Sequence, residues 1–473
     1  MRTKIVATIG PASENESVLR HMMIAGADVF RFNFSHGEHD WHSMMIDKIR
    51  KIAEEEGKNI ALMGDLQGPK IRIGEVKNGE MFLNEGEEIN ISCQEKISDE
   101  NGIYINHTNL PSEAKIGEVI LINDGKLKLR ITSIHPIDGL KAMVEIGGFL
   151  SSRKGVNLPD TCLNVKSMTD KDHRDLAFIL QHQFEWLALS FVRTSQDISE
   201  LRKAIAKTTK KQSPAIIAKI EKPEAVKNFD SILRVCDGIM IARGDLGVEV
   251  PFELLPVIQK SIIHKTIPTA KPVIVATQML EGMMTNTTPS RAEINDVANS
   301  VMDGADALML SGETSSGKYP GEAVAAMERI ILKTEEYKSI YHKSVTAHPS
   351  GSKRFISDNI ISAAVDLSKS TAAKAIVIHT FSGYTARMIA AHRPESRIFI
   401  FSDNQKLLNR LNLQWGIEGC YFKHPGITEE NFSDFENILT KHHVVSDGDL
   451  VVHVSSVPPT QKGKSNMILL HKI

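Results

Sequence analysis

Residues 215–222 read Ala-Ile-Ile-Ala-Lys-Ile-Glu-Lys, and residues 238–245 read Gly-Ile-Met-Ile-Ala-Arg-Gly-Asp. In each stretch a short apolar run is followed at once by charged side chains. Such a run is typical of a strand that is buried on both faces of a parallel sheet. The charges then fall at the carboxyl end of the strand, where parallel α/β enzymes place their sites. These two stretches predict a parallel α/β fold with a polar edge.

The same alternation extends in both directions along the chain, with amphipathic segments between most of the apolar runs. One of these segments opens with Ser290 and Glu293, which form a capping box pattern, and stops at Gly304. About eight strand–helix units predict a (β/α)₈ TIM barrel, with a doubly wound open sheet as the alternative. The expected strands are Lys4–Thr8, Asp28–Asn33, Ile60–Asp65, Leu187–Phe191, Ala215–Ile220, Gly238–Ala242, Val273–Thr277 and Ala307–Leu310.

About a hundred residues that lack this strand–helix alternation separate the third strand from the fourth. Val119–Ile122 and Lys126–Ile131 flank an Asp-Gly pair, which predicts a hairpin, and Asp138-Gly139 suggests a second one. Beyond about residue 345, helix and strand patterns alternate again, beginning with a helix over Ser357–Ser370. We therefore expect a catalytic barrel of residues 1–69 and 163–342, an inserted β-barrel lid domain of residues 70–162, and a C-terminal α/β regulatory domain of residues 343–473.

Composition excludes several classes of protein. The 473 residues carry 56 basic and 58 acidic side chains, a net charge of -2, so no overall electrostatic attraction to nucleic acid or an anionic membrane is expected. The first residues lack the apolar core of a signal peptide, and no apolar stretch is long enough to span a bilayer. The four cysteines are scattered, which favours a reduced, cytoplasmic location.

The fifth strand suggests a metal site. Lys219 and Glu221 are two residues apart and share one face of the strand, and Asp245 closes the neighbouring strand. Two carboxylates at adjacent strand ends suit Mg²⁺ or Mn²⁺, which leave positions for substrate phosphate. The alternatives are an exposed Lys219–Glu221 ion pair and a helix N-cap at Asp245.

The second strand suggests a phosphate site. Arg31, Asn33 and Ser35 alternate along its exit and so share a face. An arginine with amide and hydroxyl neighbours suits a phosphate group. The alternative is that Arg31 packs against Asp65.

Taken together, eight motifs at or near these positions closely resemble the pyruvate kinase family, in the family's order and over the whole chain. One motif would be weak evidence, whereas the full set is very specific. The motifs are Thr8-Ile-Gly-Pro-Ala-Ser13, Arg31-Phe-Asn-Phe-Ser-His-Gly37, Asp65-Leu-Gln-Gly-Pro-Lys-Ile-Arg72, Lys154-Gly-Val-Asn-Leu-Pro159, Ala218-Lys-Ile-Glu-Lys222, Ala242-Arg-Gly-Asp-Leu-Gly247, Ala276-Thr-Gln-Met-Leu280 and Met309-Leu-Ser-Gly-Glu-Thr314.

The resemblance implies transfer of the phosphoryl group of phosphoenolpyruvate to ADP, giving pyruvate and ATP in the last step of glycolysis, in a homotetramer. It implies that Glu221 and Asp245 hold Mg²⁺ and that Lys219 faces the transferring phosphoryl group and the enolate oxygen. Arg31 would clamp the phosphoryl group, the N–H groups of Gly244 and Asp245 would hold the substrate carboxylate, and Thr277 would stand near the enolate face in proton delivery. The nucleotide-side positions match Asn33, His36, Arg72 and Lys154.

One departure from the family concerns potassium. Many members hold K⁺ with residues that match Asn33, Ser35 and Asp65, and carry a glutamate where this chain has Lys70. The ammonium of Lys70 could replace the missing positive charge, so we expect activity with little K⁺ requirement. The alternative is that Lys70 is a solvated hinge residue.

The C-terminal domain contains a candidate effector loop that follows a strand and opens a helix. In the family, this region receives sugar-phosphate or nucleotide activators such as AMP. Tyr384 falls where some relatives carry a basic side chain, which argues against fructose 1,6-bisphosphate, and an ordinary N-cap is the alternative. The loop residues are Thr380, Ser382, Gly383, Tyr384 and Thr385.

Two rival functions remain open at this stage. A metal-dependent aldolase or lyase acting on pyruvate enolate would also pair a glutamate with an aspartate, but it needs neither ADP nor a lid. A phosphoenolpyruvate-sensing scaffold should lack at least one of Lys219, Glu221 and Asp245, and none of the three is missing.

Overall fold

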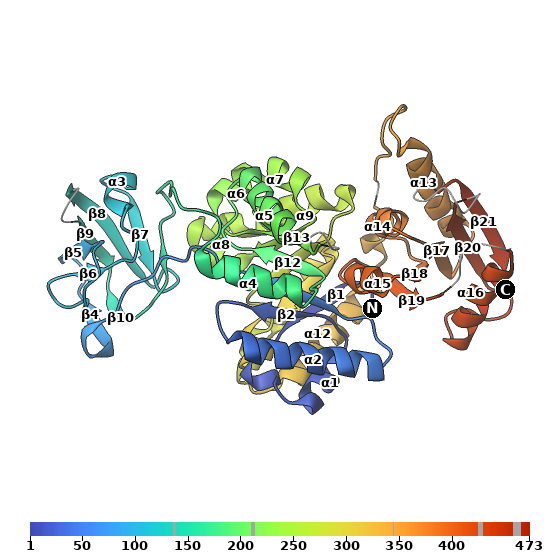
Figure 1. Ribbon diagram of the computed structural model, residues 1–473, viewed down its shortest axis with the longest axis horizontal. Helices are drawn as coiled ribbons and strands as arrows, with labels where there is room; N and C mark the ends of the chain where they lie inside the picture. The colour runs from blue at the N-terminus through green and yellow to red at the C-terminus, as the bar shows by residue number, and fades with distance from the viewer. Residues whose placement is uncertain (136–138, 210–212, 344, 424–428, 457–464) are drawn as a thin grey trace.

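The computed structural model describes residues 1–135, 139–209, 213–343, 345–423, 429–456 and 465–473. Three lobes lie in a row along the longest axis, with the inserted β domain at one end, the barrel in the middle and the C-terminal domain at the other end (Figure 1). The barrel therefore separates the two smaller lobes, and each of them covers one of its two ends.

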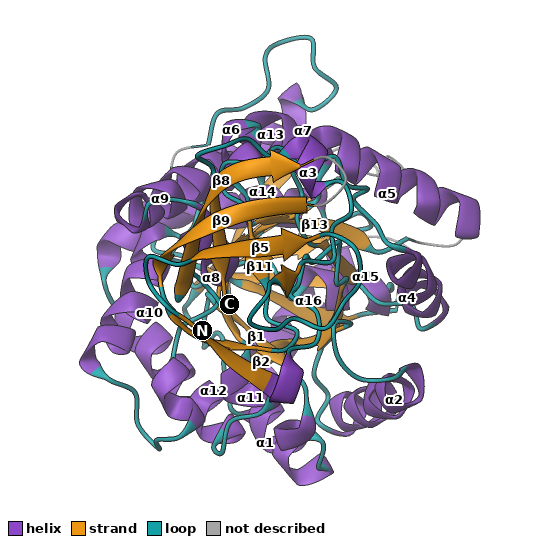
Figure 2. Ribbon diagram, turned by 90° about the vertical axis from the view of Figure 1, so that its left-hand side faces the viewer, coloured by secondary structure: helices purple, strands orange, loops and turns teal. Residues whose placement is uncertain are grey.

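The central lobe is a closed barrel of eight parallel strands, as predicted, and the open sheet is excluded. Helices surround the strands when the molecule is seen along its long axis (Figure 2). The predicted strand ends agree with the observed ones to within two residues. Around the barrel the strands are β1 (Lys4–Thr8), β2 (Ala27–Asn33), β3 (Ala61–Asp65), β12 (Trp186–Leu189), β13 (Ala215–Ile220), β14 (Gly238–Ala242), β15 (Val273–Ala276) and β16 (Ala307–Leu310).

The helices pack their apolar faces on the outside of the barrel, where they form its largest hydrophobic core. The predicted capping box opens one of them, because Ser290 Oγ accepts from the Glu293 N–H and Glu293 returns a bond to the Ser290 N–H. The helices are α1 (Glu16–Ile24), α2 (His39–Glu55), α4 (Asp170–Gln181), α5 (Ser195–Thr208), α6 (Pro223–Lys227), α7 (Phe229–Val235), α8 (Arg243–Glu249), α9 (Leu255–Thr266), α10 (Arg291–Asp303), α11 (Gly312–Ser315) and α12 (Pro320–Thr334).

The insert between β3 and β12 is a small β domain with its own apolar core. It holds a six-stranded and a two-stranded sheet, and single bridges at Arg72–Gly155 and Ile73–Ile105 link the two edges of the larger sheet. The predicted hairpin at Asp124 is β7–β8; of the second suggested turn, Asp138 lies outside the described residues. The elements are β4 (Glu80–Leu83), β5 (Glu88–Ser92), β6 (Ile103–Tyr104), α3 (Leu110–Glu113), β7 (Val119–Ile122), β8 (Leu127–His135), β9 (Gly139–Ile146), β10 (Gly148–Ser151) and β11 (Val156–Asn157).

The C-terminal lobe is an α/β domain around a five-stranded sheet of order β19-β18-β17-β20-β21, in which only the last pairing is antiparallel. Apolar clusters cover both faces of the sheet. The elements are α13 (Phe355–Ser370), β17 (Ala375–His379), α14 (Tyr384–Ala391), β18 (Arg397–Ser402), α15 (Gln405–Leu411), β19 (Ile417–Tyr421), α16 (Glu429–Lys441), β20 (Leu450–Ser455) and β21 (Met467–Lys472).

The C-terminal domain closes the amino-terminal end of the barrel. Leu413 is fully buried among the side chains that fill the barrel interior. Beside it, Arg393 makes two bonds of 3.0 and 3.1 Å to Asp306, at the start of β16, and donates a third to the Gly304 carbonyl. The C-terminal domain therefore covers this end of the barrel, so a candidate active site is expected at the opposite end.

Two further observations concern membrane-spanning helices and disulfide bonds. Among the helices that the structure describes, none has the length and apolar character needed to cross a membrane. All four cysteines carry free thiols.

Candidate active site

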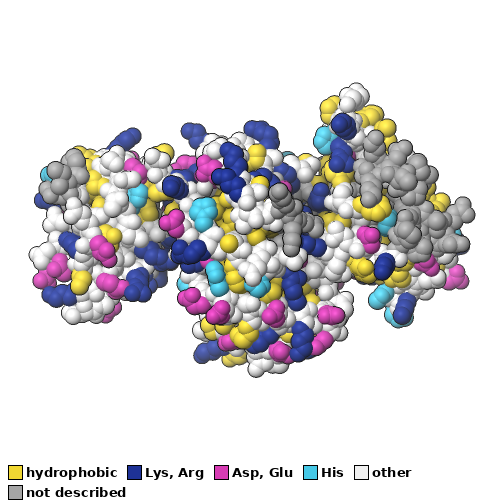
Figure 3. All heavy atoms as spheres, viewed as in Figure 1, with side chains coloured by type: hydrophobic (Ala, Val, Ile, Leu, Met, Phe, Trp, Pro, Cys, Tyr) yellow, Lys and Arg dark blue, Asp and Glu magenta, His cyan; other side chains and the backbone are white. Residues whose placement is uncertain are grey.

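The polar strand exits meet at the end of the barrel that faces the insert. Lys and Arg side chains lie on both sides of the boundary between the two lobes (Figure 3). A small cavity opens there, and it is lined from the hinge side by Lys70 and Asn157 and from the barrel side by Phe191 and Asp245. The strand order explains the convergence, because β2, β3, β12, β13 and β14 are successive neighbours in the barrel.

Lys219 is the centre of this cluster and is 9% exposed. Its ammonium lies 2.9 Å from Glu221 Oε1 and 3.2 Å from Asp65 Oδ1, and it donates a 2.8 Å hydrogen bond to Ser190 Oγ. Burial alone would lower the pKa of Lys219, but the carboxylates of Asp65 and Glu221 raise it above its ordinary value. The side chain therefore stays a cation and does not act as a base near neutral pH.

Arg31 contacts Asp65, which also contacts Lys219. This contact agrees with the alternative that Arg31 packs against Asp65. Its Nε donates to Asp65 Oδ2 at 2.7 Å, and its Nη1 donates to Thr8 Oγ1 at 3.0 Å. Burial would raise the pKa of Asp65, yet Lys219 and Arg31 hold it below the usual value. Asp65 thus fixes both cations in place at the carboxyl ends of β2 and β13.

The carboxylates of Glu221 and Asp245 are close enough for their charges to interact. Glu221 is 1% exposed and its Oε2 accepts the Phe191 N–H at 2.7 Å. Burial raises the pKa of Glu221, and the nearby negative charge of Asp245 raises it further. Two carboxylates that repel each other at the edge of a cleft are the setting in which a divalent cation is bound.

The donor set fits a metal that also binds substrate. Among the residues that the structure describes, no three His, Cys, Asp or Glu side chains are grouped to hold an ion by themselves. Oxygen ligands from only two carboxylates suit Mg²⁺ or Mn²⁺, which take their remaining ligands from water and substrate. Asp245 has a 32% exposed side chain and lines the small cavity.

Thr277 follows β15 in a strained conformation. Thr277 and Gln278 have φ angles of 69° and 55°, in the left-handed region that non-glycine residues avoid. Arg243 is buried and holds this turn by donating to the Thr277 carbonyl at 2.8 Å. Thr277 Oγ1 in turn accepts the Gly244 N–H at 2.7 Å, so that amide is already engaged here.

The four expected nucleotide-side residues are divided between the two lobes. Asn33 lies at the end of β2, and His36 is exposed just beyond it. Burial and the charge of Arg72 lower the pKa of His36 below its ordinary value. Arg72 donates to the Arg153 carbonyl, next to Lys154 on the return segment of the insert. The structure thus brings Arg72 and Lys154 into one part of the insert.

Lys70 lies on the Asp245 side of the cleft. Its ammonium is 3.7 Å from Asp245 Oδ1, and it is among the charges that lower the pKa of His36. The expected potassium pocket consists of Asn33, Ser35 and Asp65. The carboxylate of Asp65 already contacts Arg31 and Lys219, and Asn33 Oδ1 accepts a hydrogen bond from the Ser35 N–H.

The candidate effector loop opens α14. Thr380 Oγ1 accepts the Gly383 N–H at 2.9 Å, the Tyr384 hydroxyl donates to Asp358 at 2.7 Å, and Thr385 Oγ1 lies 2.7 Å from Ser465 Oγ. Ser382 is exposed, and Gly383 has a φ of 76°. Ser382 Oγ also accepts the Tyr384 N–H, at 3.5 Å, so the side chains of Thr380, Ser382, Tyr384 and Thr385 all have hydrogen-bond partners within the domain.

Sequence reasoning assigned no role to Ser190 and Arg243. Ser190 Oγ accepts a hydrogen bond from the Lys219 ammonium and donates one to the Leu66 carbonyl at 2.7 Å. The second bond fixes the orientation of the hydroxyl. The available signal was position, because Ser190 directly follows a strand that lies in register with Asp65. Arg243 gave the same signal of position, because it directly follows β14, but nothing in the sequence indicated its partners Thr277 and Asp296.

Comparison with known proteins agrees with this geometry. The family model described as pyruvate kinase, barrel domain, matches residues 1–324, and the model of the pyruvate kinase alpha/beta domain matches residues 358–471. Pyruvate kinase 2 of Synechocystis sp. is 41% identical over 471 residues, which cover 99% of this chain and 78% of that protein. Pyruvate kinase of Agrobacterium vitis is 40% identical over 474 residues, covering 100% and 97%.

A solved structure gives the same result. The crystal structure of a pyruvate kinase from Cryptosporidium parvum superimposes with a TM-score of 0.93 at 33% sequence identity, covering 100% of this chain and 96% of that one. With both family models matched and full-length relatives near 40% identity, the chain belongs to the pyruvate kinase family of phosphotransferases.

Proposed function

We propose that this protein transfers the phosphoryl group of phosphoenolpyruvate to ADP and so produces pyruvate and ATP. The observation that carries the proposal is the buried ammonium of Lys219, 2.9 Å from Glu221, beside a second carboxylate at the next strand exit. Phosphoryl transfer needs mainly alignment and neutralisation of charge, and this cluster supplies cations and metal ligands around one point.

Each residue has a role in this proposal. Glu221 and Asp245 would hold Mg²⁺ or Mn²⁺, which supplies Lewis-acid stabilisation of phosphoryl and enolate oxygens when bound. Lys219 keeps its proton and would face the transferring group and the enolate oxygen, while Arg31 would clamp the phosphoryl oxygens. The Asp245 N–H, and the Gly244 N–H once Thr277 releases it, would hold the substrate carboxylate. Thr277 would also serve proton delivery at the enolate.

The insert would act as a lid that excludes water. Arg72 and Lys154 lie in the insert, whereas Asn33 and His36 lie on the barrel, so ADP would be held between them. Expulsion of water on closure makes ADP, and not water, the acceptor of the phosphoryl group. The domain limits 1–69 with 163–342, 70–162 and 343–473 are part of the same proposal.

A coupled assay of ADP-dependent pyruvate formation tests the reaction. Turnover is expected with phosphoenolpyruvate, ADP and Mg²⁺, and none is expected without the divalent ion. Release of pyruvate without ADP would instead identify a lyase, and binding of phosphoenolpyruvate without turnover would identify a sensor.

We also propose that the enzyme works without potassium. Lys70 supports this, because its ammonium lies 3.7 Å from Asp245 Oδ1 and its charge lowers the pKa of His36, so a fixed positive charge is already present in the cleft. Turnover in tetramethylammonium chloride should stay within about twofold of turnover in KCl, since a lysine ammonium is a permanent local cation. Near-complete loss of turnover in tetramethylammonium would contradict this.

Regulation by a phosphorylated sugar or AMP at Thr380–Thr385 is a further part of the proposal, and so are a homotetramer and a cytoplasmic location. The four free thiols support a reducing compartment. Steady-state curves with and without AMP and glucose 6-phosphate test the loop. If the dependence of the rate on substrate concentration shows no cooperativity and neither compound changes it, the regulatory assignment is wrong.

A further inference from the structure

Helix α4 carries a buried carboxylate, Asp175, beside the loop that follows β2. The side chain of Asp175 is 3% exposed. The loop, residues 34–38, connects β2 to α2, directly follows Asn33 and contains His36. Asn33 and His36 are the two barrel-side positions expected to contact the nucleotide. Because an ionised carboxylate is rarely buried without partners, the contacts of Asp175 show which groups it holds in place.

Asp175 holds two side chains, one with each of its oxygens. Its Oδ2 accepts a 2.7 Å hydrogen bond from the ammonium of Lys171, one helical turn earlier in α4. Its Oδ1 lies 2.8 Å from Nε2 of His39, the first residue of α2, and the His39 ring stacks on Phe178 of α4 at 4.5 Å. Since both oxygens are engaged, the carboxylate has one orientation, and this orientation fixes the position of Lys171.

Lys171 reaches beyond its own helix to the backbone of the loop. Its ammonium also donates to the Phe34 carbonyl at 2.5 Å. That carbonyl and the Ser35 N–H belong to one planar peptide unit, so they cannot turn independently. The Ser35 N–H in turn donates to Asn33 Oδ1 at 3.1 Å. The contacts therefore run from Asp175 through Lys171 and one peptide plane to the side chain of Asn33.

The other end of the loop is held by α2 itself. His42 is buried in α2, and its Nε2 lies 3.1 Å from the His36 carbonyl. Gly37 has a φ of 77°, and a Cβ at this position would lie only 3.1 Å from His42 Cε1. The loop thus packs closely on α2 from His36 onward, whereas at Phe34 its orientation depends on the lysine of α4.

An ordinary ion pair within a helix does not account for these contacts. Lys51 and Glu55 of α2 form such a pair, four residues apart, with their charged atoms 4.0 Å apart and both side chains exposed. Asp175 differs because it is buried and because its lysine also bonds to another element. Capping of α4 does not explain it either, since Asp172 forms the capping box with Thr169. The contacts of Asp175 therefore link α4 to the loop.

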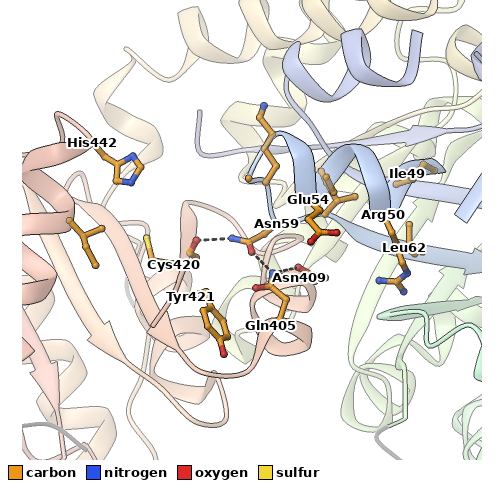
Figure 4. Close-up of a pocket in the computed structure, with 16 residues that line it drawn as sticks. Ile49, Arg50, Glu54, Asn59, Leu62, Gln405, Asn409, Cys420, Tyr421 and His442 are labelled. Carbon is orange, nitrogen blue, oxygen red and sulfur yellow. Dashed lines mark hydrogen bonds between the residues drawn. The ribbon is translucent and has the colours of Figure 1, made fainter. Parts of the chain in front are cut away.

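The far ends of α2 and α4 are joined by a different contact. Arg50 of α2 lies at the wall of a cavity between the barrel and the C-terminal domain (Figure 4) and donates to the His182 carbonyl, just past α4, at 3.2 Å. The two helices are thus held together at both ends, and the Asp175 end also bonds to the loop. Arg50 therefore provides a matched control for the packing of these two helices.

We propose that Asp175 is a positioning residue for the nucleotide and that it acts through Lys171 on the orientation of Asn33. This inference rests on the proposed use of ADP, because Asn33 lies on the barrel side of the proposed nucleotide site. A side chain that is already oriented binds a ligand more tightly than one that must first be ordered, because ordering costs conformational entropy. Phosphoenolpyruvate has its proposed partners elsewhere in the cleft, so its binding should not depend on Asp175.

Steady-state kinetics of Lys171→Met test the contact with the loop. The side chain of Lys171 is 40% exposed, so the variant should fold. KM for ADP should rise about fivefold or more, in line with the loss of a hydrogen bond from a charged group, while KM for phosphoenolpyruvate stays within about twofold. Arg50→Gln should change neither constant. Equal rises in both KM values, or no rise in either, would overturn the proposal.

A double-mutant cycle tests whether Asp175 acts through the lysine. Asp175→Ala should also raise KM for ADP, because Lys171 then loses the partner that holds it. The double variant should be no worse than the more affected single variant, since both changes interrupt the same chain of contacts. Multiplying fold-changes would show that the two residues act independently and would contradict the proposal. Asp175→Asn takes the place of the alanine variant if the latter does not fold.

Hydrogen exchange separates this inference from the proposed reaction. Without any ligand, peptides covering residues 33–39 should take up deuterium about fivefold faster in Lys171→Met than in wild type and Arg50→Gln, because the Ser35 N–H loses its fixed orientation. Failure of the wild-type protein to form pyruvate from phosphoenolpyruvate and ADP would refute the proposed function and leave this comparison valid. Normal turnover in wild type, with equal uptake in all three proteins, would refute the positioning role alone.

Discussion

Lys219 carries a charge that a barrel interior would not tolerate alone. Two carboxylates and a hydroxyl, all within 3.2 Å of its ammonium, make that position stable. The same three partners prevent the side chain from reaching other conformations. Its charge is therefore presented at a fixed place, which is the property that electrostatic stabilisation of a transition state requires.

Replacing Lys219 by methionine should abolish phosphoryl transfer and preserve the fold. The two side chains are close in volume, but methionine cannot stabilise the transferring charge, so kcat should fall about a thousandfold or more. Turnover in the coupled assay and circular dichroism measure the two effects. Lys227→Met changes an exposed lysine of α6 and serves as the control; full activity in the Lys219 variant would refute the assignment.

Ser190→Ala should reduce catalysis without affecting substrate affinity to the same degree. The hydroxyl orients the Lys219 ammonium, and its loss leaves that cation two partners in place of three. We expect kcat to fall about tenfold, in line with the loss of one hydrogen bond to a charged group. Ser190→Thr keeps a hydroxyl and should recover part of the rate, and equal rates for the alanine and threonine variants would exclude positioning.

At the level of elements, α2 places a buried histidine directly beneath the active-site loop. His42 is 2% exposed, and burial lowers its pKa to about 4, partly offset by the hydrogen bond to the His36 carbonyl. Above pH 6.5 the ring is neutral in both the folded and the unfolded chain. Between pH 6.5 and 4 the unfolded chain takes up the proton first, so stability falls as the pH falls.

His42→Gln should therefore flatten the acid side of the stability profile. The histidine contributes about 3 kcal/mol to the loss of stability between neutral pH and pH 4, because one pKa unit corresponds to about 1.4 kcal/mol. Urea unfolding at pH 7 and pH 4.5 measures the difference between wild type and variant. Parallel profiles for the two proteins would show that His42 is not the titrating group.

A second element, α8, connects the insert to the barrel through a buried carboxylate. Glu249 Oε1 accepts from Lys222 Nζ at 2.5 Å and from Asn157 Nδ2 at 2.7 Å, and its side chain is fully buried. This one residue therefore joins the loop after Glu221 to the return strand of the insert.

Glu249→Gln should destabilise the protein by about 3 kcal/mol, because Lys222 would be left without its counter-charge in a largely buried position. Glu253→Gln, at an exposed carboxylate just beyond α8, is the matched control and should change stability by less than about 0.5 kcal/mol. Urea unfolding compares them, and equal midpoints for both variants would show that the buried ion pair contributes nothing.

At the scale of the whole molecule, the C-terminal domain is held to the barrel by a buried ion pair. Arg393 is 1% exposed and Asp306 is likewise 1% exposed.

Arg393→Met should lower the free energy of unfolding by about 3 kcal/mol or more and separate the thermal unfolding of the two lobes into two calorimetric transitions. Arg397→Met breaks an ion pair within the C-terminal domain and is the control; a single, unshifted transition in the Arg393 variant would contradict this account.

Much of this architecture could be predicted from sequence because local pattern determines it. The buried strands are short apolar runs with polar ends, and the cap at Ser290 and the turn at Asp124 have side-chain signals of their own. Convergence of Lys219, Glu221 and Asp245 followed from barrel geometry.

Other features depend on contacts between distant segments. The role of Ser190 depends on Lys219 in the next strand, and the strain at Thr277 depends on Arg243. A cavity between the barrel and the C-terminal domain is lined by Arg202 of α5 together with Arg387 of α14 and Arg410 of α15, which are about two hundred positions away in the sequence. No periodicity or motif reports such a pairing, because it arises only when the two lobes pack together.

The central claim is that Glu221 and Asp245 hold a divalent ion opposite the ammonium of Lys219. Anomalous diffraction from crystals grown with Mn²⁺ and oxalate measures this most directly. The account predicts one manganese peak about 2.2 Å from oxygen atoms of both carboxylates, with Lys219 facing the bound oxalate. A manganese site elsewhere, with the Glu221 carboxylate still bonded to the Phe191 N–H and turned from the ion, would contradict it.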